Sequence, residues 1–362
     1  MAIKGLVYVP RAETDGCWGE RAGLPQVANR PLAGLILEEL AAAGVDSLAV
    51  VASSDQLDAV RAGIASDPAH QLDVRFLELT AAARLAEALS AARGFVGDDA
   101  VILHLATGML GQSCEPLVAR AGEQKEDLRL LLHHGSEGSG PLSPRTERLL
   151  GVSTLGKPAG RLALAGVAVF RPGGFAMASR TSSCGREYPL TAIDEEPEHE
   201  LIAIADDLAG EGLTIAAGLV NGWHECSADP SALLELNRSI LDRQARSVHH
   251  HAGVGGNRIE GRVVIHPTAQ VSASVILGPS LIGPEARIAD AYIGPYTTVG
   301  AGAVVENCEI LGSIIGPGAR LSHVGGRIEG STIGCDANIF RDFRLPRAMR
   351  LHVGEGVEIS LS

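Results

Sequence analysis

The chain has 362 residues, of which 46% are hydrophobic but only 3% are aromatic, and 44 are glycine. This length suits about two domains, and an aliphatic, glycine-rich composition favours α/β units and β-solenoids over a β-sandwich core. The formal net charge of −13 would repel nucleic-acid phosphates and anionic membranes, so neither is an expected partner. A nucleotide pocket can still be locally positive.

The cysteines predict neither a zinc site nor a disulfide framework, because they are scattered and show no C-x-x-C spacing. They are Cys17, Cys114, Cys184, Cys226, Cys308 and Cys335. The first residues, MAIKGLVYVP, lack the pattern of a signal peptide, and no apolar run reaches membrane-spanning length. We therefore expect reduced thiols and a cytoplasmic protein.

Residues 5–51 predict a βαβ unit. GLVYVP is a short apolar run typical of a buried strand, and the irregular loop RAETDGCWGERAG follows it. A helix is expected from Pro31, with Asn29 as its cap and Gly44 as its end, before a strand at Leu48–Val51. The loop after the first strand is where such folds place ligands.

The next elements continue the α/β pattern. Helices are expected over Ser54–Ile64 and Thr80–Ala92, with a strand near Val74–Leu77 between them. A buried strand is expected at Asp99–Leu105, and its end, with His104, lies at the carboxyl edge of the sheet, the usual ligand side. A last helix is expected at Asp229–Leu241.

From about Arg258 small branched aliphatic residues recur every five or six positions, often followed by glycine or proline. This period predicts a left-handed parallel β-helix of hexapeptide repeats, with the aliphatic residues stacked inward and glycine or proline at the corners. The expected fold is therefore a Rossmann-like α/β domain over residues 1–245, followed by a β-helix domain over residues 258–362. Because such coils expose flat faces that commonly pack together, a homo-oligomer is expected.

The segment LPQVANRPLAGLILEELAAAGVDSLAVV resembles the one after the signature loop of sugar-1-phosphate nucleotidyltransferases. The long-form glucose-1-phosphate thymidylyltransferases of actinobacteria are the most similar group, and the resemblance extends to the final PRAMRLHVGEGVEISL. The family loop, G-G-x-G-T-R-L-x-P, and the lysine that follows it are replaced here by VPRAETDGCWGERAG, in which Arg11 and Arg21 are the basic residues. The frame of the family is present, but its signature loop is not.

The resemblance implies roles for residues at the carboxyl edge. HLATG resembles the family's Y-L-G-D-N, whose Asp binds magnesium, so Thr107 stands at the metal position and Gly108 at the neighbouring Asn. GWHECS resembles G-W-K-D-T-G, which places Trp223 in the substrate site and Glu225 at the second metal position. A threonine hydroxyl is a weak ligand for a hard dication that prefers carboxylates.

Two further segments carry expected substrate contacts. GVSTLGKPAGRLALAGVAVF resembles the stretch from E-K-P to L-A-L-V-G-V-Y, which makes Lys157 the sugar-phosphate lysine and adds Gly166. GREYPLT resembles G-E-L-E-I-T and contributes Glu187 and Thr191 to the substrate site. Gly156 and Pro189 replace the family's two glutamates.

Each of these residues also has an alternative role. Lys157 can be a solvated loop lysine, and Glu225 a surface carboxylate at a helix start, which the helix dipole favours. His104 can be a core histidine whose hydrogen bonds are satisfied. Cys17 and Trp18 can either build a new small-molecule pocket or pack a turn.

The family reaction needs donors around the triphosphate, a cation and carboxylates that hold it. Since several of these groups are replaced, we expect a degenerate or repurposed relative that binds a nucleotide, nucleotide-sugar or metabolite, and assembles with an active relative or another pathway enzyme. The alternative is an active but atypical enzyme that uses Lys157, Glu225 and a loop arginine, and Mg²⁺ is expected only in that case. A hexapeptide-repeat acyltransferase with His323 as its catalytic residue is a third possibility.

Overall fold

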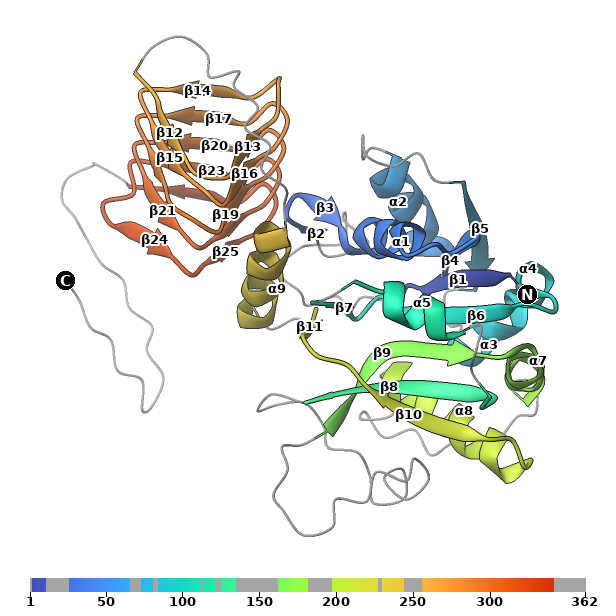
Figure 1. The fold of residues 1–362 in the computed structure, drawn as a ribbon. Helices are drawn as coiled ribbons and strands as arrows, with labels where there is room; N and C mark the ends of the chain where they lie inside the picture. Colours follow the sequence, from blue (N-terminus) through green and yellow to red (C-terminus); the bar gives the residue numbers. More distant parts are fainter. Residues whose placement is uncertain are drawn as a thin grey trace, which may run out of the picture.

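The computed structural model describes residues 2–10, 26–65, 73–80, 84–111, 113–121, 125–134, 162–181, 197–226, 230–243 and 256–341. These residues form an α/β domain and a three-sided parallel coil (Figure 1). The described elements of the first part end at Arg243 and those of the coil begin at Arg258.

The α/β domain contains a seven-stranded sheet of order β10-β8-β9-β6-β1-β4-β5. β9 runs antiparallel to both of its neighbours, β6 and β8, and the other pairs are parallel. The strands are β1 (Ile3–Tyr8), β4 (Ser47–Ser53), β5 (Val74–Leu79), β6 (Ala100–Leu105), β8 (Leu128–His134), β9 (Leu162–Phe170) and β10 (Ile215–Leu219). The predicted Rossmann-like class is confirmed.

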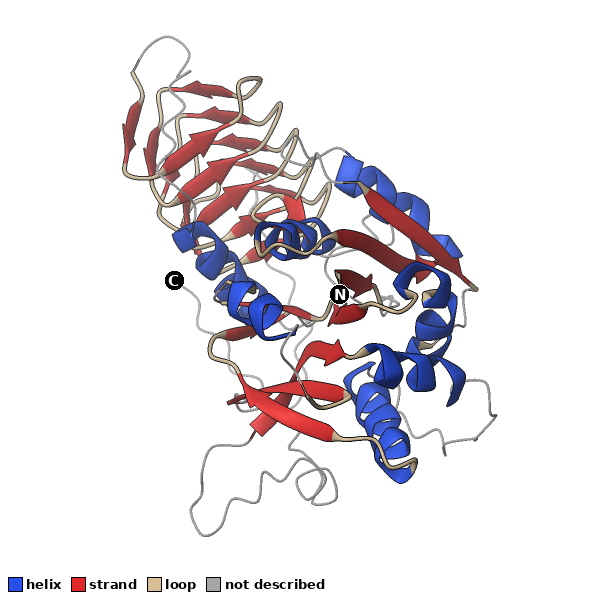
Figure 2. Ribbon diagram, turned by 45° about the vertical axis from the view of Figure 1, so that its right-hand side comes forward, coloured by secondary structure: helices blue, strands red, loops and turns tan. Residues whose placement is uncertain are grey.

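Helices cover both faces of this sheet and bury a core on each (Figure 2). One face packs against α1 (Leu32–Ala42), α2 (Ser54–Ala65), α5 (Glu115–Ala121) and α9 (Pro230–Arg243). The other packs against α3 (Leu85–Ala91), α4 (Arg93–Val96), α7 (Pro172–Thr181) and α8 (Pro197–Gly210).

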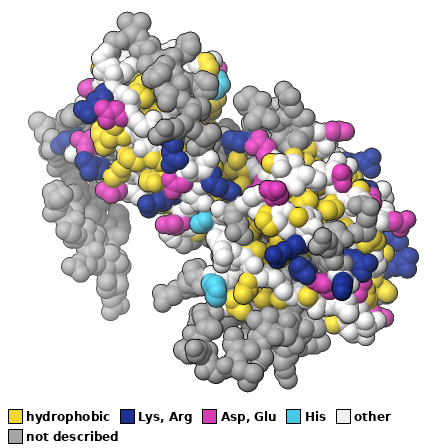
Figure 3. Space-filling view, viewed as in Figure 1, with side chains coloured by type: hydrophobic (Ala, Val, Ile, Leu, Met, Phe, Trp, Pro, Cys, Tyr) yellow, Lys and Arg dark blue, Asp and Glu magenta, His cyan; other side chains and the backbone are white. Residues whose placement is uncertain are grey.

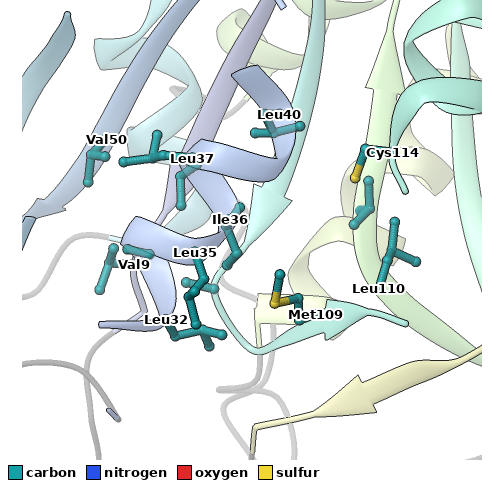
Figure 4. Close-up of a cluster of buried hydrophobic side chains, with 14 of the residues drawn as sticks. Val9, Leu32, Leu35, Ile36, Leu37, Leu40, Val50, Met109, Leu110 and Cys114 are labelled. Atoms are coloured by element: carbon teal, nitrogen blue, oxygen red, sulfur yellow. The ribbon is translucent and has the colours of Figure 1, made fainter. Parts of the chain in front are cut away.

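Helix α1 shows how the predicted apolar spacing becomes a core. Leu32, Ile36 and Leu40 are buried at helical spacing, and Ile36 projects toward Met109 (Figure 4). Within the described residues the N-cap position is Pro31, which makes no side-chain capping bond.

The prediction that Asn29 caps this helix is wrong. Its side-chain amide instead donates a hydrogen bond of 2.7 Å to the carbonyl oxygen of Val299 in the coil. Asn29 lies in the left-handed region, with φ 59°, in the turn between β2 (Gln26–Val27) and β3 (Arg30–Pro31). A long-range contact therefore uses a side chain that local sequence rules assign to a helix end.

The coil is built from three five-stranded parallel sheets, one on each side, as predicted for a left-handed β-helix. Every described rung contributes one short strand to each side. The first side holds β12 (Arg258–Glu260), β15 (Val275–Leu277), β18 (Tyr292–Ile293), β21 (Glu309–Leu311) and β24 (Arg327–Glu329). The second holds β13 (Val263–Ile265), β16 (Ser280–Ile282), β19 (Thr297–Val299), β22 (Ile314–Ile315) and β25 (Thr332–Ile333), and the third β14 (Gln270–Ser272), β17 (Arg287–Ala289), β20 (Val304–Glu306), β23 (Arg320–Ser322) and β26 (Asn338–Phe340).

The glycines that follow inward aliphatic residues are explained by close approach of neighbouring rungs. A Cβ on Gly300 would lie 2.5 Å from the backbone nitrogen of Pro317, and one on Gly316 would lie 2.8 Å from that of Cys335. Only glycine fits at a position where neighbouring backbone occupies the space that a side chain would need. The aliphatic residues themselves, such as Ile293 and Ile310, are fully buried.

Helix α9 and the β2–β3 turn join the two domains. Asn237 on α9 is buried; its side chain accepts a bond from the Ala28 amide at 3.1 Å and donates one to the Tyr296 carbonyl at 3.3 Å. Arg262 of the coil pairs with Asp242 at 3.0 Å. Polar groups in this junction are thus held in defined positions by both domains.

Basic and acidic side chains are interspersed over the face of the molecule shown in Figure 3. Neither sign of charge dominates this face. Among the described residues, no helix combines the length and the apolar character needed to cross a membrane.

Candidate functional site at the carboxyl edge of the sheet

The two segments expected to carry metal and substrate groups meet beside the end of β6. The chain continues from β6 into β7 (Gly108–Leu110), which pairs antiparallel with β11 (Trp223–Glu225). In this ladder Glu225 lies opposite Gly108, and the Cys226 amide donates a 2.7 Å hydrogen bond to the Thr107 carbonyl. Backbone pairing thus brings together two segments that are more than a hundred residues apart in the sequence.

Thr107 interacts with a carboxylate that the sequence analysis did not identify. Its hydroxyl donates a short hydrogen bond to Glu198, in the first turn of α8. Acidic residues are common in the first turn of helices because they complement the helix dipole, so nothing in the local sequence marks Glu198 as special.

Two glycines of the site are required by contacts within the protein. A Cβ on Gly108 would lie 2.5 Å from Cζ2 of Trp223, and one on Gly166 would lie 2.6 Å from Oγ1 of Thr107. Since real Cβ atoms do not approach so closely, both positions let neighbouring side chains lie against the backbone. Gly166, on β9, is thereby placed directly beside Thr107.

His104 lies next to this group on the same face of the sheet as α1 and is only 1% exposed. Its Nδ1 lies 2.7 Å from the Leu105 carbonyl oxygen, so Nδ1 carries the proton and Nε2 presents a lone pair. Nε2 is buried and has no hydrogen-bond partner among the described residues. Burial lowers the pKa of His104 to about 4, which keeps the ring neutral near pH 7.

The Trp223 indole connects His104 to a second histidine that the sequence analysis did not single out. Its ring centroid is 5.9 Å from that of His104 and 6.2 Å from that of His133, at the end of β8. Burial lowers the pKa of His133 as well. The histidine expected to be a satisfied core residue is thus satisfied at one nitrogen only.

The described residues bring together Thr107, Gly108, Gly166, Trp223 and His104, and add Glu198. Arg11, Arg21, Lys157, Glu187 and Thr191 lie outside the described residues. Glu225 is placed by its backbone, opposite Gly108. The geometry therefore supports a polar, partly aromatic site at the carboxyl edge, with a carboxylate and a hydroxyl in contact.

Within the described part of the chain, no three His, Cys, Asp or Glu residues are grouped as a metal site. Mg²⁺ favours carboxylate oxygens, and Thr107 offers a neutral hydroxyl whose proton is already donated to Glu198. The donor set described at this position fits a hard dication less well than a carboxylate would.

No protein-family model matches the chain. Two glucose-1-phosphate thymidylyltransferases are similar to it: that of Streptomyces antibioticus, 28% identical over 353 residues, and that of Streptomyces griseus, 27% identical over 344 residues. These alignments cover 93% and 94% of this chain, respectively, and 93% of each relative.

The low-salt glycan biosynthesis nucleotidyltransferase Agl11 of Haloferax volcanii is 25% identical over 346 residues, 93% of either chain. A solved Bacillus anthracis structure, named for the same thymidylyltransferase activity, covers 65% of this chain and 94% of its own at 16% identity, with a TM-score of 0.49. The chain thus resembles the glucose-1-phosphate thymidylyltransferases along nearly its whole length, from the sheet through the β-helix.

Proposed function

We propose that this chain binds a nucleotide or nucleotide-sugar at the carboxyl edge of its sheet without the metal-dependent transfer chemistry of its relatives. In this proposal the protein is a degenerate or repurposed nucleotidyltransferase, and it acts by ligand binding or by assembly with pathway enzymes. The hydrogen bond from Thr107 to Glu198 carries the proposal, because it commits the residue at the expected metal position to a partner inside the protein.

The features that hold a ligand are better preserved than those that hold a cation. Trp223 offers an apolar surface of the kind that packs on a sugar or a base, and it is half-buried beside the sheet edge. This contact requires no metal ion.

The second candidate is an active, atypical sugar-1-phosphate nucleotidyltransferase, and Glu198 favours it. A carboxylate can accept several contacts at once, so a cation and the bond from Thr107 are compatible on Glu198. Together with Glu225 opposite Gly108, the edge would then regain two carboxylates from different elements. Mg²⁺ would be held by Glu198 and Glu225 and would supply charge stabilisation at the transferring phosphate.

Titration calorimetry with dTTP and dTDP-glucose, with and without Mg²⁺, separates the two candidates when it is combined with pyrophosphate release from dTTP and glucose 1-phosphate. We expect magnesium-independent binding and no release. Magnesium-dependent dTTP binding with turnover would refute the degenerate assignment. The absence of both binding and pyrophosphate release would refute nucleotide binding at this site and direct the search to protein partners.

Single substitutions test whether ligand binding and pyrophosphate release depend on the carboxyl edge of the sheet. Trp223→Ala is expected to weaken dTDP-glucose binding at least about tenfold, roughly the loss of one good apolar contact. Leu219→Ala, which truncates a 65% exposed side chain on β10, is the matched control and should bind like the wild type. Glu225→Ala should leave binding nearly intact under the first candidate and abolish pyrophosphate release under the second.

A further inference from the structure

One described corner of the β-helix is two residues longer than its counterparts in the other turns. Between the third and first sides, Ile288 and Ile293 are five residues apart, as are Val305 and Ile310. In the next turn of the coil, Leu321 and Ile328 are seven apart, and the additional residues form the corner 323–326. Insertions in repeat proteins often line a binding face.

A hollow of about 550 Å³ lies directly beside this corner. Its volume is within the usual range for small-molecule sites. Two rows of aligned residues on β20, β23 and β26 line the hollow. One row is Val304, Arg320 and Asn338, and the other is Glu306, Ser322 and Phe340. Adjacent strands in a sheet lie about 4.8 Å apart, so these rows are continuous surfaces.

The inserted corner positions a cationic group at the edge of the hollow. A Cβ on Gly325 would lie 2.7 Å from Nη1 of Arg341, so the guanidinium lies against backbone that only glycine leaves open. His323 lines the same edge in the left-handed region, φ 53°, and its Nδ1 lies 3.1 Å from the Asn307 side-chain amide. Because that amide donates, the imidazole Nε2 carries the proton and is a donor.

The lining combines two guanidinium groups with an exposed aromatic ring. Phe340 is 59% exposed, and among the described residues only Leu219 is a comparably exposed large apolar side chain. Arginine forks match phosphate oxygens, and an exposed phenyl ring is a stacking surface for a nucleobase. Glu306, the one acidic residue in the lining, can accept hydrogen bonds from sugar hydroxyls.

From this combination we propose that the hollow on the third side of the β-helix is a second ligand site, which takes a nucleoside phosphate. The base stacks on Phe340, and Arg320 and Arg341 bind the phosphates. Asn338 and Ser322 supply neutral hydrogen bonds to the ligand. This site lies on β20, β23 and β26 and shares no residue with the carboxyl edge of the sheet.

Titration of the full-length protein with dTDP, thymidine and inorganic pyrophosphate tests the proposal in a Trp223→Ala background, which removes the indole of the sheet-edge site. We expect dTDP binding that Arg320→Ala or Arg341→Ala each weakens about tenfold, the effect of one lost charged contact. Phe340→Ala should weaken dTDP and thymidine but leave pyrophosphate unchanged. Arg287→Ala, on β17 of the same sheet but outside the hollow, is the matched control and should have no effect.

Three outcomes would overturn the proposal. One is dTDP binding that none of the three lining variants alters. Another is binding of pyrophosphate without binding of thymidine and without any effect of Phe340→Ala, which would indicate a simple anion site. The last is absence of ligand binding together with an oligomer that Phe340→Ala dissociates in sedimentation velocity, which would make the hollow an interface between copies of the chain.

Discussion

Glu39 provides a test of the packing between α1 and α9 that does not depend on any ligand. Its side chain is only 11% exposed, and its nearest cation is Arg243 on α9, at 3.5 Å. The Cys114 thiol before α5 also hydrogen-bonds it, and Arg243 contacts the Met109 sulfur of β7 at 3.6 Å. Burial raises the pKa of Glu39 to about 7, although Arg243 opposes this shift.

The sign of the effect follows from linkage. The pKa is higher in the folded state than in the unfolded state, so the folded protein retains the proton over a pH range in which the unfolded chain has lost it. The stabilising contribution is therefore complete below about pH 4.5 and is lost as the pH rises through about 7. Removing the ionisable group abolishes this loss.

We expect the difference in unfolding free energy between Glu39→Gln and wild type to increase, in favour of the variant, by about 2.5 kcal/mol from pH 5 to pH 8. This value follows from the pKa shift at 1.36 kcal/mol per pKa unit. Urea denaturation followed by circular dichroism at half-unit pH steps measures the difference. Glu115→Gln removes a carboxyl from an exposed position and corrects for the change in net charge. A Glu39→Gln difference that stays constant across this range would refute the assignment of Glu39 as a buried, proton-retaining carboxyl.

Three further substitutions test the site, the coil and the domain junction. Gly108→Ala forces a methyl group into the Trp223 ring and should cost roughly 1–3 kcal/mol of stability and weaken dTDP-glucose binding, as measured by urea denaturation and calorimetry. Gly300→Ala, against the backbone of Pro317, should destabilise by a similar amount of roughly 1–3 kcal/mol, lowering the coil's melting transition in calorimetry. Asn237→Ala leaves two backbone groups of the junction without their partner and should cost about 1–3 kcal/mol per buried group; unchanged stability would show that water replaces the side chain.

The fold was predictable because periodicity reports burial. The alternation of strand and helix signals in the first half, and the aliphatic repeat in the second, depend only on which side chains face inward. Asn29 shows the limit of such rules. Local preference assigns it to a helix cap, whereas the folded chain uses its amide to hold Val299 of a domain that begins more than two hundred residues later.

The candidate site was predictable where backbone pairing positions it. Gly108 and Glu225 are paired in the ladder of β7 and β11, and Thr107, in the turn before β7, accepts a hydrogen bond from the Cys226 amide. Glu198 could not be predicted in the same way, because its place in the first turn of a helix is ordinary and no motif marks it. The unpartnered Nε2 of His104 depends on three-dimensional burial that a single apolar strand does not specify.

The electrostatics of the carboxyl edge connect these findings to function. Thr107 is neutral, and the carboxylate beside it comes from Glu198 on α8. Without a cation, a carboxylate at this place repels the phosphates of a nucleotide, and binding must then depend on neutral contacts such as that of Trp223. With a cation, the same carboxylate becomes a ligand and the repulsion turns into attraction. The sensitivity of nucleotide affinity to Mg²⁺ is therefore the property in which a binding protein and an active enzyme built on this site must differ most.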